Sequence, residues 1–119
     1  MQCQDIITVH VPKTAETVNL VNKETIQKCK KGVRIINCAR GGIINENDLA
    51  NAIKSGHVAG AAFDVFETEP PVNKEYFNLQ NVIISPHIGG STQESILAMG
   101  RAAIDGLDNY MAAEKYLLL

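Results

Sequence analysis

The chain has 119 residues, of which 45% are hydrophobic, and a formal net charge of −2 at pH 7. This length suits one compact domain rather than two. A slightly negative charge, few aromatic residues and no tryptophan argue against nucleic-acid or anionic-membrane partners, which favour a basic patch. No apolar run approaches the roughly 20 residues of a membrane span, and no signal peptide is apparent, so we expect a cytoplasmic protein.

The cysteines are Cys3, Cys29 and Cys38, an odd number with no CxxC pair. This pattern argues against a disulfide framework and against a zinc site. We therefore expect reduced thiols and no metal centre.

Apolar runs, capping residues and breakers predict strands that alternate with helices. In chain order these are a strand over residues 6–11, a helix from Asn22 to near Gly32, a strand over 33–37, a helix capped by Asn45 and ended by Gly56, a strand over 57–64, a loop over 67–72, a strand over 81–85, and a helix from Thr92 to about Ala112.

Strands alternating with helices predict an α/β fold with a parallel sheet. The near-continuous apolar strands are those expected when helices cover both faces. The GxGxxG turn of a doubly wound dinucleotide-binding sheet is missing, which suggests a partial, Rossmann-like sheet corresponding to its second half. Such a half-sheet would expose an apolar edge and face, so we expect a homo-oligomer or association through that surface.

Two basic side chains follow predicted strand ends. Arg40 lies after the strand over 33–37 and before two glycines, and His87 follows the strand over 81–85. Ligands of open α/β sheets bind at the carboxyl ends of the strands. A guanidinium offers a planar fork for a carboxylate, and an imidazole can exchange a proton near neutral pH. An ordinary surface arginine and a solvated loop histidine are the alternatives.

Acidic residues gather after the third predicted strand. Glu67 and Glu69 lie in one proline-bearing loop, and either could hydrogen-bond an imidazole and orient it. An exposed acidic loop is the alternative. Asp64 ends the strand, where it could face a ligand or cap a helix.

Three segments together resemble the D-2-hydroxyacid dehydrogenase family. They are Asn37-Cys38-Ala39-Arg40-Gly41-Gly42, the stretch from Gly60 to Phe66 and on to Glu69-Pro70, and Pro86-His87-Ile88-Gly89-Gly90-Ser91-Thr92. The resemblance extends from about Asp5 to Asn109. The Gly-Gly-Ser-Thr continuation is most similar to family members that act on 3-phosphoglycerate.

The resemblance implies an oxidoreductase that moves hydride between NAD and a small D-2-hydroxy or 2-keto acid, here 3-phosphoglycerate and 3-phosphohydroxypyruvate in serine biosynthesis. Arg40 would hold the substrate's carboxylate and keto oxygen, and His87 would exchange a proton with that oxygen. Glu69, which stands immediately before a proline as the family's acid does, would pair with His87. Positions that match the cofactor site are Val11, Cys38, Ala39, Arg40, Asp64, His87 and Gly90.

The resemblance further implies that residues 1–119 form a single, partial NAD-binding domain. The GxGxxG half and the substrate domain would be absent from it, and the chain would be inactive by itself. Two alternatives remain: an NAD-linked, corepressor-like binding protein of the same fold, and a self-associating half-domain without activity.

Overall fold

The computed structural model describes residues 3–72 and 74–109, without the side chain of Asp108. The chain divides into two compact units, and the boundary in the sequence lies between His87 and Ile88. Each unit is described by itself.

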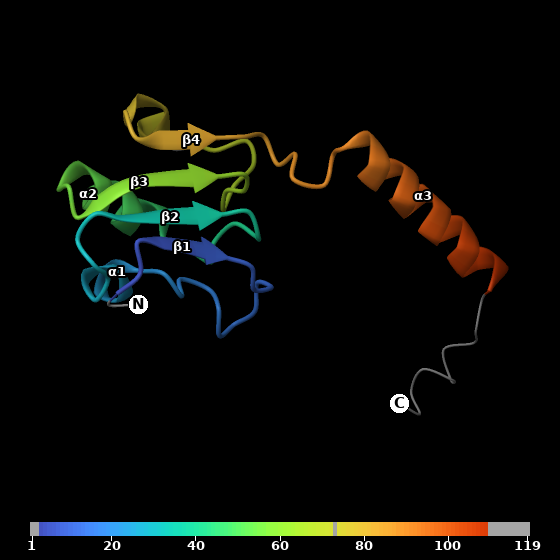
Figure 1. Cartoon of the computed structure of the whole chain (residues 1–119), viewed down its shortest axis with the longest axis horizontal. Helices are drawn as coiled ribbons and strands as arrows, with labels where there is room; N and C mark the ends of the chain where they lie inside the picture. The colour runs from blue at the N-terminus through green and yellow to red at the C-terminus, as the bar shows by residue number, and fades with distance from the viewer. Residues whose placement is uncertain (1–2, 73, 110–119) are drawn as a thin grey trace. The chain divides into compact units, whose positions relative to one another are not determined.

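The first unit is built on one parallel sheet. Its strands β1 (Ile6–Val9), β2 (Val33–Asn37), β3 (Val58–Phe63) and β4 (Val82–Ile84) lie side by side in chain order, and all four run in the same direction (Figure 1). This arrangement confirms the predicted α/β class. It also brings the carboxyl ends of all four strands to one edge of the sheet.

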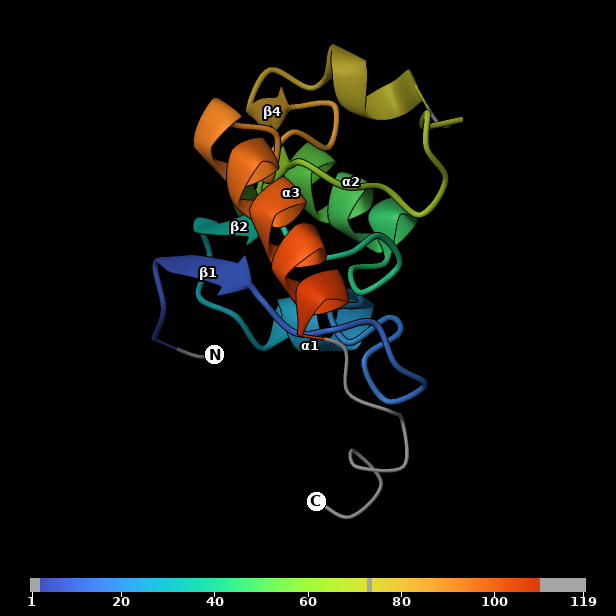
Figure 2. The same cartoon turned by 90° about the vertical axis from the view of Figure 1, so that its right-hand side faces the viewer.

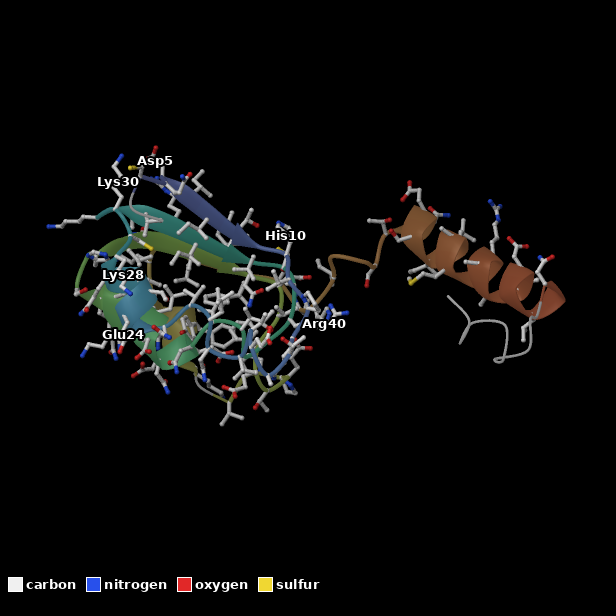
Figure 3. The ribbon with its side chains drawn as sticks, turned by 90° about the horizontal axis from the view of Figure 1, so that it is seen from below. Asp5, His10, Glu24, Lys28, Lys30 and Arg40 are labelled. Atoms are coloured by element: carbon white, nitrogen blue, oxygen red, sulfur yellow. The ribbon has the colours of Figure 1, made fainter. Side chains whose placement is uncertain are left out.

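Helices α1 (Lys23–Gln27) and α2 (Glu46–Lys54) connect the first three strands. Both lie on the same side of the sheet (Figure 2 and Figure 3). Asn22 begins α1 with a capping box, in which its side-chain oxygen accepts the amides of Glu24 and Thr25. Asn45 begins α2 by accepting the amide of Asp48 at 3.0 Å. Such side chains satisfy amides that have no partner within the helix.

The helix α1 ends at Gln27, earlier than the predicted end near Gly32. The chain has to turn back there to enter β2, and His57 holds that turn. The ring nitrogen Nε2 of His57 hydrogen-bonds the carbonyl of Ile26 at 3.0 Å, while the amide of Gly32 donates to the carbonyl of His57 at 2.8 Å. Gly32 has a φ of +88°, which glycine adopts without steric cost.

The core lies between the sheet and the two helices. Along β2, Val33, Ile35 and Asn37 are buried whereas Arg34 is exposed, which is the alternation of a strand covered on one face. A 3₁₀ helix, η1 (Lys74–Asn78), precedes β4 and was not predicted from the sequence. It contributes Tyr76, whose ring packs edge-on against Phe63 at 5.0 Å between centroids.

The opposite face of the sheet carries exposed apolar side chains. Ile6 is 57% and Ile83 is 72% exposed. Within residues 3–72 and 74–87, helices therefore cover one face of the sheet, and the other face is exposed, as expected for a half-sheet. Small and β-branched residues occupy both faces of the strands. The composition of the strands therefore did not show which face is covered.

The second unit holds the helix α3 (Gln93–Asp108). The hydroxyl of Thr92 accepts the amide of Ser95 at 3.1 Å, which confirms the predicted start. The predicted end near Ala112 lies outside the described residues. Among the described helices, none combines the length and the apolar character needed to cross a membrane.

Candidate active site

The candidate site residues of the first unit follow the carboxyl ends of the strands. Val11 comes after β1, Cys38 to Arg40 after β2, Asp64 and Glu69 after β3, and His87 after β4. In Figure 3, His10 and Arg40 lie at this end of the sheet, whereas Asp5 and Lys30 form an ion pair at the other end. Parallel pairing alone places these segments at one edge, where ligands of such sheets bind.

Glu69 and His87 are in direct contact. The ring nitrogen Nδ1 of His87 donates to Oε2 of Glu69 at 2.8 Å, and the other oxygen, Oε1, accepts the amide of Phe66 at 3.0 Å. The hydrogen bond from His87 is the first cause, and the Phe66 amide the second, of a pKa of Glu69 below its usual value of 4.5. Glu69 is therefore a carboxylate at neutral pH, and it orients the imidazole. Of the two acids of the loop, Glu69 rather than Glu67 bonds His87, which matches the sequence-based preference.

The backbone of His87 is in an uncommon conformation. Its φ is +55°, in the left-handed region that costs a non-glycine residue roughly 1–2 kcal/mol. Outliers of this kind persist where surrounding structure fixes them, and they cluster at functional sites. The hydrogen bond to Glu69 is one such constraint, because it ties the ring of His87 to a residue 18 positions earlier in the chain.

A cavity of about 550 Å³ lies beside the Glu69–His87 pair. Its walls are mostly apolar and include Phe66, Phe77 and Ile84. Asp64 also lines it, and one carboxylate oxygen of Asp64, Oδ1, accepts the hydroxyl of Ser85 at 2.6 Å. This bond joins the end of β3 to the end of β4. Asp64 is only 5% exposed, so its carboxylate is held inside the fold rather than in solvent.

Arg40 lines a second cavity, of about 530 Å³, at the ends of β1 and β2. Its guanidinium is exposed and donates through Nη1 to the carbonyl of Ala39 at 2.7 Å. Four of the residues predicted to contact substrate or cofactor line this one cavity, namely Val11, Cys38, Ala39 and Arg40. His10 and Lys13 complete its basic side.

Asn37 is a positioning residue that sequence reasoning missed. It is buried, its side-chain amide donates to the carbonyl of Arg40 at 3.0 Å, and its side-chain oxygen accepts the amide of Ala39 at 3.1 Å. Both bonds shape the turn that carries Arg40. The available signal was an asparagine in an otherwise apolar strand, because a buried amide side chain requires partners.

The predicted site residues of the first unit are divided between two cavities. Glu69 bonds His87 directly, and Asp64 lines the same cavity as that pair. Arg40 lines the other cavity. Gly90 belongs to the second unit, so its part in the site stays a prediction.

A parallel α/β sheet with polar residues gathered at its carboxyl edge is typical of Rossmann-like nucleotide-binding domains. The family model of the "D-isomer specific 2-hydroxyacid dehydrogenase, NAD binding domain" matches residues 1–89. The chain belongs to this family, as its sequence motifs indicated.

Known relatives agree with this assignment. D-3-phosphoglycerate dehydrogenase of Bacillus subtilis is 60% identical over 97 residues, which are 82% of this chain and 18% of that protein. The human D-3-phosphoglycerate dehydrogenase is 52% identical over 91 residues, which are 76% of this chain and 17% of that protein. This chain thus spans less than a fifth of the length of these relatives.

A similar solved structure is the holo form of D-mandelate dehydrogenase from Rhodotorula graminis. It superposes with a TM-score of 0.86 at 35% identity, over 89% of this chain and 31% of that chain. The fold assignment therefore rests on an experimental structure as well as on sequence.

Proposed function

We propose that this chain carries the substrate-gripping and proton-transferring residues of an NAD-dependent D-2-hydroxyacid dehydrogenase. In this proposal Arg40 binds the substrate's carboxylate, His87 exchanges a proton with the substrate oxygen, and Glu69 orients His87. The observation that carries the proposal is the 2.8 Å bond between His87 Nδ1 and Glu69 Oε2 at the carboxyl edge of the sheet.

The pair leaves one ring nitrogen of His87 for the reaction. Because Glu69 accepts the hydrogen on Nδ1, the neutral imidazole carries its lone pair on Nε2. In the oxidising direction Nε2 takes the hydroxyl proton of the substrate, and in the reducing direction it returns a proton to the keto oxygen. The Glu69 carboxylate stabilises the imidazolium, which is the form of His87 after oxidation of the substrate and before reduction of the keto acid.

The residues at the β1 and β2 ends fit the nicotinamide end of a dinucleotide. The cavity there joins apolar walls from Val11 and Ala39 to the cation of Arg40, which suits a flat ring next to a substrate anion. Cys38, Asp64, His87 and Gly90 complete the proposed cofactor contacts. NAD, when bound, would accept or supply the hydride. The protein's own part is to align the substrate and to move its proton.

We propose 3-phosphoglycerate as the substrate, oxidised to 3-phosphohydroxypyruvate in serine biosynthesis. Two relatives at 60% and 52% identity are D-3-phosphoglycerate dehydrogenases, which supports this member of the substrate class over other hydroxy acids.

We further propose that this chain is the partial NAD-binding domain of a longer enzyme, because it matches less than a fifth of the length of its relatives. The purified full-length enzyme tests the proposed activity. We expect 3-phosphoglycerate to drive formation of NADH, and D-lactate or D-mandelate to do so far more slowly. His87→Ala should lower turnover by on the order of 10²- to 10⁴-fold without unfolding the protein, because His87 is exposed. Lys31→Ala, a change to an exposed residue just before the start of β2 and so at the opposite end of the sheet, is the control and should leave turnover unchanged. A protein that binds NAD but oxidises none of these acids would contradict the dehydrogenase proposal and favour a binding role.

A further inference from the structure

The loop that carries Glu69 is held from two sides by the segment that runs from Gly41 to the first turn of α2. On one side is Gly41, where an added Cβ would lie 1.8 Å from the carbonyl oxygen of Phe66. The two backbones are therefore in direct contact, and only glycine fits. On the other side is Glu46, whose oxygen Oε1 accepts the amide of Glu67 at 2.6 Å. The peptide between Phe66 and Glu67 is thus held between Gly41 and the first turn of α2.

Phe66, which contributes the carbonyl of this peptide, also binds the Glu69 carboxylate through its own amide, one peptide earlier in the chain. The carbonyl of Phe66 contacts Gly41, and the amide of the same Phe66 donates to Glu69 Oε1 at 3.0 Å. Glu69 in turn holds His87 through its other oxygen. Since Gly41 directly follows Arg40, a short chain of contacts connects the candidate carboxylate-binding residue with the candidate proton-transferring residue.

The carboxylate of Glu46 is not an incidental surface group. Glu46 is partly buried, and burial is the first cause of a pKa above its usual value of 4.5. The amide of Glu67 opposes that effect, whereas the charge of Glu67 adds to it. A charged group retained in a place that penalises it suggests a role in positioning other groups.

We propose that Glu46 is a positioning residue for the proposed reaction. It fixes the Phe66–Glu67 peptide and through it the orientation of Glu69 and His87. This inference rests on the proposed function for its catalytic consequence, but the geometric claim can be measured without any activity.

A matched control exists in the same turn of α2. Asp48 also accepts a backbone amide from another segment, that of Lys23 at 2.9 Å, but this partner lies at the start of α1 and not on the Glu69 loop. Loss of the Asp48 bond removes a comparable structural link without touching the loop. A merely structural role of Glu46 therefore predicts equal effects at both positions, and a positioning role predicts a difference.

The experiment compares Glu46→Met, Glu46→Gln and Asp48→Ala. Methionine keeps the length and helix propensity of glutamate without an acceptor, and glutamine keeps an acceptor oxygen for the Glu67 amide. The first readout is the pKa of the Glu69 carboxyl group. It is measured in the 119-residue chain by ¹³C NMR, and the carboxyl signal of Glu69 is identified by its loss in Glu69→Gln. The second is kcat of the full-length protein with NAD and 3-phosphoglycerate.

We expect Glu46→Met to move the pKa of Glu69 back toward its usual value and to lower kcat by about 10- to 100-fold. Glu46→Gln should restore most of both, and Asp48→Ala should change neither. The inference is overturned if Glu46→Met leaves the Glu69 pKa as in the wild type, or if Asp48→Ala shifts it equally. A wild-type protein without dehydrogenase activity would count against the proposed function alone, because the NMR comparison would still decide the positioning role.

Discussion

The side chain of Asn37 is bonded to the backbone of Arg40. Nδ2 of Asn37 donates to the carbonyl of Arg40 at 3.0 Å, from a side chain that is almost fully buried at the end of β2. A buried amide therefore sets the turn that presents an exposed guanidinium.

Replacement of Asn37 should affect stability and activity together. We expect Asn37→Ala to lower the free energy of unfolding by about 1–3 kcal/mol, because backbone groups lose their partners inside the fold. In the full-length protein it should also raise KM for the hydroxy acid. Denaturant unfolding and steady-state kinetics measure the two effects. Asn51→Ala, a change on the exposed side of α2, is the control. It should leave KM unchanged and should raise the free energy of unfolding, by at most about 0.7 kcal/mol, because alanine favours a helix more than asparagine does.

Arg40→Lys tests the carboxylate grip. Lysine keeps the charge but cannot offer two parallel donors, so kcat/KM should fall by about 10- to 100-fold, which corresponds to roughly 1.5–3 kcal/mol for a bond to a charged group. Arg34→Lys, a change at an exposed position within β2, is the control and should leave kcat/KM unchanged. Unchanged kinetics for Arg40→Lys would remove this residue from substrate binding.

Glu69 makes stability and activity depend on pH. The bonds from His87 and from the Phe66 amide lower its pKa, so its contribution to the free energy of unfolding is present above the usual value of 4.5 and is lost as the pH falls through the lowered value. Glu69→Ala should flatten that acid limb of the stability curve. In the full-length protein it should also displace the pH–rate profile, because His87 loses a charged partner. A profile that does not move would exclude Glu69 from the mechanism.

Glu46 should show the opposite pH dependence. Burial raises its pKa, so its contribution to stability is present at low pH and is lost as the pH rises from about the usual value of 4.5 through the raised one. Glu46→Gln cannot titrate and keeps an acceptor for the Glu67 amide. We therefore expect its Tm to exceed that of the wild type at pH 7 and to match it near pH 4. A lower Tm at pH 7 would contradict this sign.

The exposed sheet face predicts association of the 119-residue chain. Ile6 and Ile83 present apolar side chains to solvent, and large exposed apolar patches favour contacts between proteins. Sedimentation should show species larger than a monomer, and the double change Ile6→Lys with Ile83→Lys should shift them toward monomer. Val72→Lys alters a side chain that is 79% exposed in a loop, away from the sheet, and should leave the distribution unchanged.

Local sequence patterns were enough to predict the order and type of most elements. Asn22, Asn45 and Thr92 act as caps where the pattern predicted them, because capping depends on side chains and amides only two or three residues apart. The three motifs likewise identified the family, since each is a short run of residues that can be read without the fold. The same patterns predicted that Arg40, Glu69 and His87 follow strand ends.

The residues alone left both Glu67 and Glu69 open as partners of His87, and the folded structure shows that Glu69 is the one in contact, as the family resemblance implied. Glu69 contacts His87, and the Glu69 loop contacts Gly41 and Glu46. These contacts join segments about 20 residues apart, and strand pairing is what brings such segments together. The end of α1 is likewise joined to a distant residue, because the ring of His57 hydrogen-bonds the carbonyl of Ile26. The covered face of the sheet was also undetermined, since apolar residues occupy both faces and the position of the helices alone selects one. Long-range pairing, which no local pattern encodes, supplied the site.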